Sequence, residues 1–106
     1  WIRLRGVSGE KRVDMKTKRI FKYTIDLDKR EQEVVMPEFA EVLSVQLQHG
    51  NAQTWALVDP DDEQKPRKFF VFVTGAFVEN SERLRFVGTI QLHGGSIVLH
   101  IFEKTS

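Results

Sequence analysis

Apolar and polar residues alternate along several short stretches of the chain, and a period of two predicts strands with one buried face. The first stretch is Phe21–Leu27, and a shorter one at Val34–Met36 ends at Pro37, a residue confined to strand ends and sheet edges. The alternation returns at Val42–Gln48, and Thr54–Val58 is expected to pair back against it. The chain therefore begins as a series of short antiparallel strands.

The turn Gly50-Asn51 is expected to join the last two of these strands, since glycine and asparagine suit tight hairpins. Pairing across it places Leu47 opposite Thr54 and puts Trp55 on the polar face, with Gln46 and Ser44. A large aromatic side chain on a polar face either packs beneath a second layer or belongs to a binding surface. Trp55 is therefore a candidate for ligand or partner binding.

A second hairpin is expected around His93-Gly94-Gly95-Ser96, which separates two further alternating strands at 86–92 and 97–102. A two-residue turn there gives one apolar face and one mixed face. The apolar pairs are Ile90 with Leu99 and Leu92 with Ile97, and the mixed pairs are Thr89 with His100 and Gln91 with Val98. The agreement of this pairing with the apolar pattern supports the register.

The segment Phe69–Val73 has no polar face, and it follows a polar loop over Asp59–Pro66. Such a strand is either central and covered on both sides, or it completes its burial against another chain. A domain this small has limited means to cover both faces of several strands, so a homo-oligomer is expected. The predicted interface residues are Phe69, Phe70, Val71 and Phe72.

Six or seven short strands without a convincing helix predict an all-β domain, either a small antiparallel β-sandwich or a partly open β-barrel. The length of 106 residues suits a single domain. We place this β domain at residues 18–106, after a basic N-terminal extension over residues 1–17.

Charge is distributed unevenly along the chain. Residues 1–22 hold eight lysines and arginines against two carboxylates, a balance of +6, whereas the remaining residues carry −5. A basic arm of this kind can bind nucleic acid through phosphate contacts. Met15 has the surroundings of a natural start of translation, and residues 1–14 would then be an upstream extension.

Cysteine is absent, which excludes disulfides, thiol nucleophiles and cysteine-bound zinc. No apolar run reaches the roughly 18 residues of a membrane span, and the N-terminus lacks the apolar segment of a signal peptide. We therefore expect no membrane contact and a location in the cytoplasm.

The histidines offer little catalytic chemistry. On the expected register His93 and His100 lie about 13 Å apart along the strand, at about 3.3 Å per residue, which is too far to share a metal ion. Thr89 is a natural hydrogen-bond partner for His100. The acidic loop at 59–63 lacks the spacing of a calcium loop, and Gly94-Gly95 lacks the phosphate-binding glycine motifs. Because no nucleophile, base and orienting acid can be assembled, we predict no enzyme, metal or cofactor.

Three segments carry a resemblance to a known family: Trp55–Pro60, Gly88–Gly95 and His100–Glu103. On these motifs the stretch from about Lys18 to Glu103 resembles a family of short proteins encoded by tailed bacteriophages and prophages, for which no activity is established. Its members usually begin near the counterpart of Met15. The resemblance implies a phage protein acting in the cytoplasm of its bacterial host, and it brings no catalytic residue to transfer.

Three functions remain open. The first is a non-enzymatic phage accessory protein that inhibits a host defence protein or sequesters a nucleotide signal. The second is a component of the virion or of its assembly, and the third is a nucleic-acid binder that uses residues 1–22. For a phosphorylated ligand, cations contact the phosphate and an aromatic ring stacks on the base. The candidate ligand or partner residues are Tyr23, Trp55, Arg83, Arg85, His93 and His100, with further cations at Arg19, Lys22, Arg67 and Lys68.

Overall fold

The computed structural model describes residues 17–105, and strands dominate this part of the chain. The predicted basic extension lies outside the described residues, apart from Thr17. In chain order the elements are β1 (Arg19–Ile25), β2 (Glu31–Pro37), β3 (Glu41–Gln48), β4 (Asn51–Val58), β5 (Gln64–Val73), η1 (Ser81–Arg83), β6 (Leu84–Leu92), η2 (His93–Gly95) and β7 (Ile97–Lys104).

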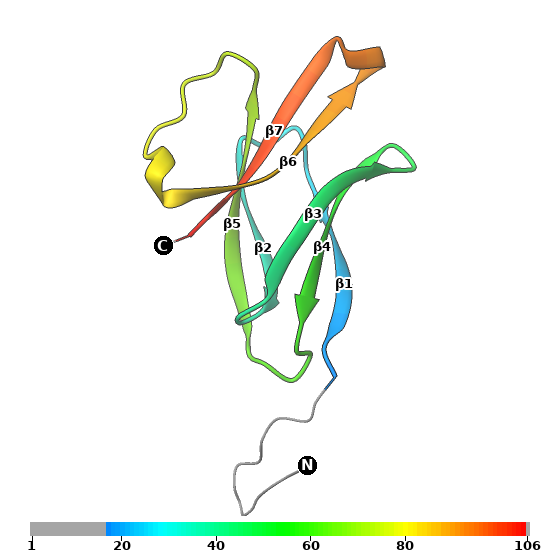
Figure 1. The fold of residues 1–106 in the computed structure, drawn as a ribbon, viewed down its shortest axis with the longest axis vertical. Coiled ribbons are helices and arrows are strands. Elements are labelled where there is room, and N and C mark those ends of the chain that lie inside the picture. The colour runs from blue at the N-terminus through cyan, green and yellow to red at the C-terminus, as the bar shows by residue number, and fades with distance from the viewer. Residues whose placement is uncertain (1–16, 106) are drawn as a thin grey trace, which may run out of the picture.

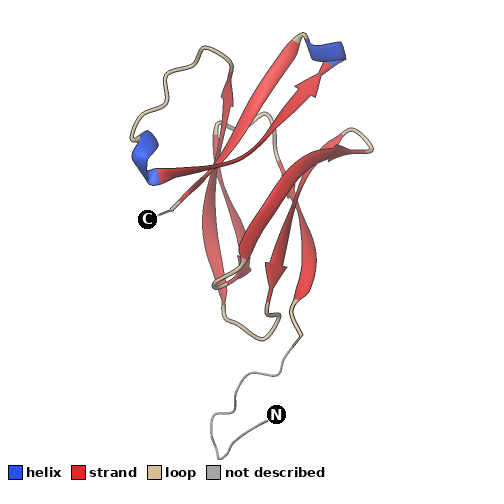
Figure 2. Ribbon diagram, in the orientation of Figure 1, coloured by secondary structure: helices blue, strands red, loops and turns tan. Residues whose placement is uncertain are grey.

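Within residues 17–105 the seven strands form two antiparallel sheets (Figure 1). The smaller sheet has the order β1-β4-β3, and the larger sheet has the order β2-β5-β7-β6. Figure 2 shows that strands make up both layers, while the short 3-10 helices η1 and η2 stand at the two ends of β6. The predicted all-β fold is confirmed as a β-sandwich whose sheets do not close into a barrel.

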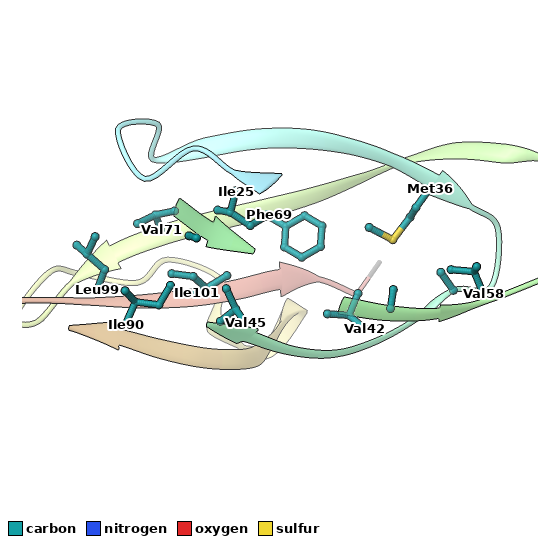
Figure 3. Close-up of a cluster of buried hydrophobic side chains, with 13 residues drawn as sticks. Ile25, Met36, Val42, Val45, Val58, Phe69, Val71, Ile90, Leu99 and Ile101 are labelled. Carbon is teal, nitrogen blue, oxygen red and sulfur yellow. The ribbon is translucent and has the colours of Figure 1, made fainter. Parts of the chain in front are cut away.

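The apolar core fills the space between the two sheets (Figure 3). Phe69, Val71 and Ile101 come from the central strands of the larger sheet, and Val42 and Val45 come from β3 of the smaller sheet. Phe69 and Ile101 are fully buried. Full burial of one apolar side chain contributes about 1.5–3 kcal/mol, so this layer is the main source of the domain's stability.

The β3–β4 hairpin turns one residue earlier than predicted, and the choice of Gly50-Asn51 as the turn is wrong. His49 and Gly50 occupy the turn with φ angles of 52° and 82°. Two central residues with positive φ give the tight turn whose twist matches that of the flanking strands. Leu47 consequently pairs with Ala52 rather than with Thr54, a register shift of two residues.

A shift of two residues keeps the side chains from Ser44 onward on their predicted faces, because side chains along a strand alternate. Trp55 pairs with Ser44 and lies opposite to the core-facing side of β4, where Thr54 and Ala56 are buried. The predicted placement of Trp55 on the polar face is therefore confirmed, although the predicted register is wrong. A bulge at Leu43 changes the pairing again near the start of β3, where Val42 is buried and Leu43 is exposed, the reverse of the predicted alternation.

The β6–β7 hairpin has the predicted register, since Ile90 pairs with Leu99. Its connection is longer than the predicted two-residue turn. Leu92 and Ile97 form the last pair, and η2 lies between them. A bulge at Val87 shifts the pairing between the start of β6 and the end of β7. As a result Phe86 pairs with Phe102 and faces outward from the larger sheet.

β5 lies between β2 and β7 in the larger sheet, and the residues of Phe69–Val73 alternate between the core and the outer face. The strand begins at Gln64, so part of the predicted loop belongs to it. Phe69 and Val71 point into the core of their own chain and are not accessible to a partner. Phe70 and Phe72 lie on the opposite face of the strand, where Phe72 is only 6% exposed between Phe70, Phe102 and Arg30. The predicted interface is therefore reduced to the half-buried Phe70.

A buried carboxylate joins the two sheets at one end of the sandwich. Glu103 on β7 is 2% exposed and accepts hydrogen bonds from Arg67 Nε at 2.6 Å and Arg85 Nη2 at 3.1 Å. Arg67 also donates to the carbonyl oxygen of Ala40, and Arg85 to that of Val42, each at 3.0 Å. The two arginines therefore tie the larger sheet to the chain that enters β3.

A close approach of β6 to β3 leads to the first prediction. Gly88 follows the bulge in β6, and a Cβ atom at this position would lie 2.7 Å from Cγ1 of the buried Val45. The branched Cβ of valine restricts its χ1 angle, so the side chain cannot easily turn away. We expect Gly88→Ala to lower the free energy of unfolding by about 1–3 kcal/mol, the usual cost of overpacking a core. Urea denaturation measures this loss.

The matched control is the double variant Gly88→Ala/Val45→Ala. Removing the valine methyl groups opens the space that the new Cβ needs, so the double variant should lose less than the two single variants together. Additive losses would contradict a contact between these two strands.

Candidate binding site on the outer sheet face

Four phenylalanines gather on the outer face of the larger sheet, the face directed away from the core. Phe70, Phe102 and Phe86 pair side by side across β5, β7 and β6, and we call these three residues the outer aromatic row. The ring centroids of Phe86 and Phe102 lie 5.4 Å apart, and Phe72 meets Phe102 edge to face at 5.7 Å. The outer face of a sandwich is ordinarily polar, so an apolar row there indicates a contact surface.

An open pocket of ≈ 650 Å³ lies beside this row, and we call it the outer pocket. Phe70 and Phe72 contribute its apolar lining. Its walls come from the start of β2 on one side and from η1 with the start of β6 on the other. In Figure 1, η1 is the short yellow helix near the C-terminus. The described lining residues are Arg30, Glu31, Lys68, Phe70, Phe72, Glu79, Asn80, Arg83, Leu84 and Lys104.

Arg30 is fixed beside Phe72 by three contacts. Its carbonyl oxygen accepts a hydrogen bond from the Val71 amide at 2.9 Å, which attaches the β1–β2 turn to β5. Its guanidinium carbon lies 5.4 Å from the Phe72 ring centroid, and Nη2 donates to the Phe77 carbonyl oxygen at 3.4 Å. A cation over an aromatic face is attracted by the ring quadrupole. Arg30 thus holds a positive charge directly against the apolar lining of the pocket.

Lys68 on β5 and Glu31 on β2 form an ion pair at 2.8 Å in the pocket wall. The hydrogen bond and the negative charge of Glu31 raise the pKa of Lys68, so the lysine is cationic at neutral pH. Both side chains are partly exposed to water, and exposed ion pairs contribute little to stability. Lys68 can therefore exchange Glu31 for a ligand anion at a small energetic cost.

The outer pocket concentrates positive charge on a part of the chain that is acidic overall. Its described lining holds four cations and two carboxylates, whereas residues 23–106 together carry −5. Half of the eight lysines and arginines in that stretch therefore line one pocket. The four cations are Arg30, Lys68, Arg83 and Lys104. Such a concentration of one sign of charge favours an anionic ligand.

In the structure, most of the predicted ligand residues lie far from one another. Arg83 lines the outer pocket. Tyr23 packs against the core from β1, and its burial raises the pKa of its phenol. Trp55 lies on the other sheet, and Arg85 is engaged with Glu103. The pocket therefore unites Arg83 and the candidate cation Lys68 with Phe70 and Phe72, which the sequence had marked as interface residues.

Neither histidine candidate lines the outer pocket. His93 is exposed in η2, at the tip of the β6–β7 hairpin. His100 lies on the outer face with Nδ1 at 3.0 Å from Thr89 Oγ1 and Nε2 at 2.8 Å from Thr74 Oγ1. The predicted hydrogen bond between His100 and Thr89 is confirmed. Among residues 17–105 no group of three or more potential ligands could hold a metal ion.

Several residues of this face were missed at the level of sequence. Phe102 carried a usable signal, because it lies two residues beyond His100 and therefore shares its face. Phe86 carried none, since the bulge at Val87 moves it to the outer face. Arg30 belongs to a polar turn, where nothing in the sequence distinguishes it from neighbouring exposed charges.

Fold and face together define a class of protein: an antiparallel β-sandwich with an aromatic and cationic pocket on the outer face of its larger sheet. The family described as "Domain of unknown function (DUF7352)" matches residues 16–106, and the chain belongs to this family. The chain matches no curated protein and no solved structure. No helix among residues 17–105 is long and apolar enough to cross a membrane.

Proposed function

We propose that this protein is a non-enzymatic binding protein that takes up a nucleotide-like ligand in the outer pocket. The observation that supports this most strongly is the placement of cations around two phenylalanine rings, with Arg30 directly over Phe72. A nucleotide offers both complements at once, since its base can stack on the half-buried Phe70 and its phosphate accepts charge-assisted hydrogen bonds from the cations.

The lining of the pocket favours binding over catalysis. The described lining residues include no serine, threonine, tyrosine, cysteine or histidine, the side chains that most often act as nucleophiles or bases. Of its two carboxylates, Glu31 is paired with Lys68. Apart from Glu79, the charged lining residues that remain are donors suited to holding an anion.

The biological setting follows from the resemblance to short proteins of tailed phages. We place the binding activity in a phage accessory protein, located in the cytoplasm of the bacterial host, that removes a nucleotide signal and so leaves a host defence protein without it. We also propose a homo-oligomer, because the outer pocket is open and a second copy can complete its enclosure.

Native mass spectrometry of protein purified from bacterial lysate without denaturation tests this proposal. We expect an additional mass of a few hundred daltons on the wild-type protein and its loss from Arg83→Ala. Isothermal titration with AMP and ATP should show weaker binding to Arg83→Ala by about 10- to 100-fold, the effect of one charge-assisted hydrogen bond.

The control variant is Lys65→Ala, which removes an equal charge from an exposed ion pair with Glu63 outside the pocket lining. It should retain both the additional mass and the nucleotide affinity. The proposal is wrong if the two variants behave alike, or if the wild-type protein carries no additional mass and binds neither nucleotide.

A further inference from the structure

The aromatic surface continues beyond the outer pocket. Phe70 lines the pocket, but its neighbours Phe102 and Phe86 in the outer aromatic row do not. Phe86 is 53% exposed and extends the apolar surface of Phe70 and Phe102 across the sheet. A ligand that fits the pocket alone would leave Phe86 in water.

A second row of side chains runs parallel to the aromatic one. Lys68 and Lys104 lie two residues from Phe70 and Phe102 on the same strands, and side chains at this spacing share a face. At about 3.3 Å per residue the two rows are about 7 Å apart. The outer face thus presents stacking surfaces along one line and positive charges along the next.

The width of the aromatic row exceeds the reach of one base. Phe70 and Phe86 stand on strands separated by β7, which makes the distance between their backbones about 10 Å at about 4.8 Å per strand spacing. Aromatic rings interact when their centroids lie about 4.5–7 Å apart. One base can therefore stack on either end of the row but not on both.

We infer that the ligand of this face is a segment of single-stranded nucleic acid that places successive bases along the outer aromatic row and its phosphates along Lys68 and Lys104. The inference rests on the proposed function, because it takes the outer pocket as the site of the first nucleotide. Stacking on phenylalanine and contact with lysine read no base edges, so the binding tolerates any sequence.

The test measures fluorescence anisotropy of labelled oligothymidylates and oligouridylates of two, four and eight nucleotides with the full chain, alongside titration with TMP. We expect affinity to rise from TMP to the longer oligonucleotides and to fall with salt. Phe86→Ala should weaken octamer binding by about 5- to 150-fold, the effect of one lost base-stacking contact, and should leave TMP binding unchanged.

The matched control is Phe77→Ala, which removes an 89% exposed phenylalanine from the β5–β6 loop, outside the aromatic row. It should change neither affinity. The inference alone fails if TMP binds and longer oligonucleotides gain nothing, or if octamer binding is insensitive to Phe86→Ala, as it would be for attachment through the basic residues 1–22. If neither TMP nor any oligonucleotide binds, the proposed function fails as well.

Discussion

Replacing Arg67 by methionine is expected to lower the free energy of unfolding by about 3–5 kcal/mol, the usual cost of removing one partner from a buried ion pair. Arg67 donates to the 2% exposed Glu103 through Nε and also forms an ion pair with it through Nη2. Methionine preserves much of the side-chain volume but leaves Glu103 with the single contact from Arg85 at 3.1 Å. Urea denaturation followed by circular dichroism measures the loss.

Two further variants identify its cause. Arg85→Met should cost less, about 1 kcal/mol, because Arg85 is 46% exposed and water can replace its hydrogen bonds. Arg67→Met/Glu103→Gln should recover part of the loss, since the amide removes the uncompensated charge. Equal losses for both arginines, without recovery by glutamine, would show that the cluster acts through packing and not through charge.

The strand pattern was predictable because burial on one face leaves a period of two in the sequence. Trp55 illustrates how robust this signal is: the turn was placed at the wrong residues, yet a shift of two left Trp55 on the polar face and changed its partner from Gln46 to Ser44. The turn itself could not be predicted, because His49 adopts a positive φ that the neighbouring glycine and asparagine accept more easily. A register error of two residues therefore changes the predicted pairing partners but leaves the predicted faces unchanged.

Bulges could not be predicted from the alternation of apolar and polar residues. One additional residue at Val87 reverses the face of every residue between it and the start of β6, and Phe86 consequently joins Phe102 on the outer side. No residue of the local sequence indicates the bulge by itself. Gly88 hints at it in retrospect, because a strand glycine often marks a close approach of another chain segment, here that of Val45.

The candidate site could not be derived for a related reason. Its cations come from the β1–β2 turn, β5, η1 and the end of β7, segments far apart in the sequence. Each of them taken singly is an ordinary exposed charge. The net charge of +1 gives no indication that four cations lie together. They come together because the strand order places β5 between β2 and β7.

The four-stranded sheet thus separates two tasks by face. Its inner side supplies Phe69, Val71 and Ile101 to the core, and its outer side carries the aromatic row and the pocket cations. Because adjacent residues on β5 belong to different faces, stability and binding can be changed independently by neighbouring substitutions. The run Phe69–Phe70 offers the sharpest comparison of this kind.

Phe69→Ala should lower the free energy of unfolding by about 3–5 kcal/mol, since it empties a fully buried position that the surrounding strands cannot refill. Domains of this size have total stabilities of about 5–15 kcal/mol, so the variant should be marginally folded. Phe70→Ala removes a half-buried ring from the outer face and should cost about 1 kcal/mol while weakening nucleotide binding. Thermal and urea denaturation, with nucleotide titration of the folded variants, measure both effects.

The same pair decides whether the outer face is a ligand site or a subunit interface. If β5 is covered on its outer side by a second copy, Phe70→Ala removes contacts between chains, and its effect on stability grows as protein concentration rises, because dissociation is linked to unfolding. If the outer face binds a ligand, the cost of Phe70→Ala is small and independent of concentration, and added nucleotide stabilises the wild-type protein more than the variant. A loss from Phe70→Ala as large as that from Phe69→Ala, with the expected dependence on concentration, would assign the outer aromatic row to assembly.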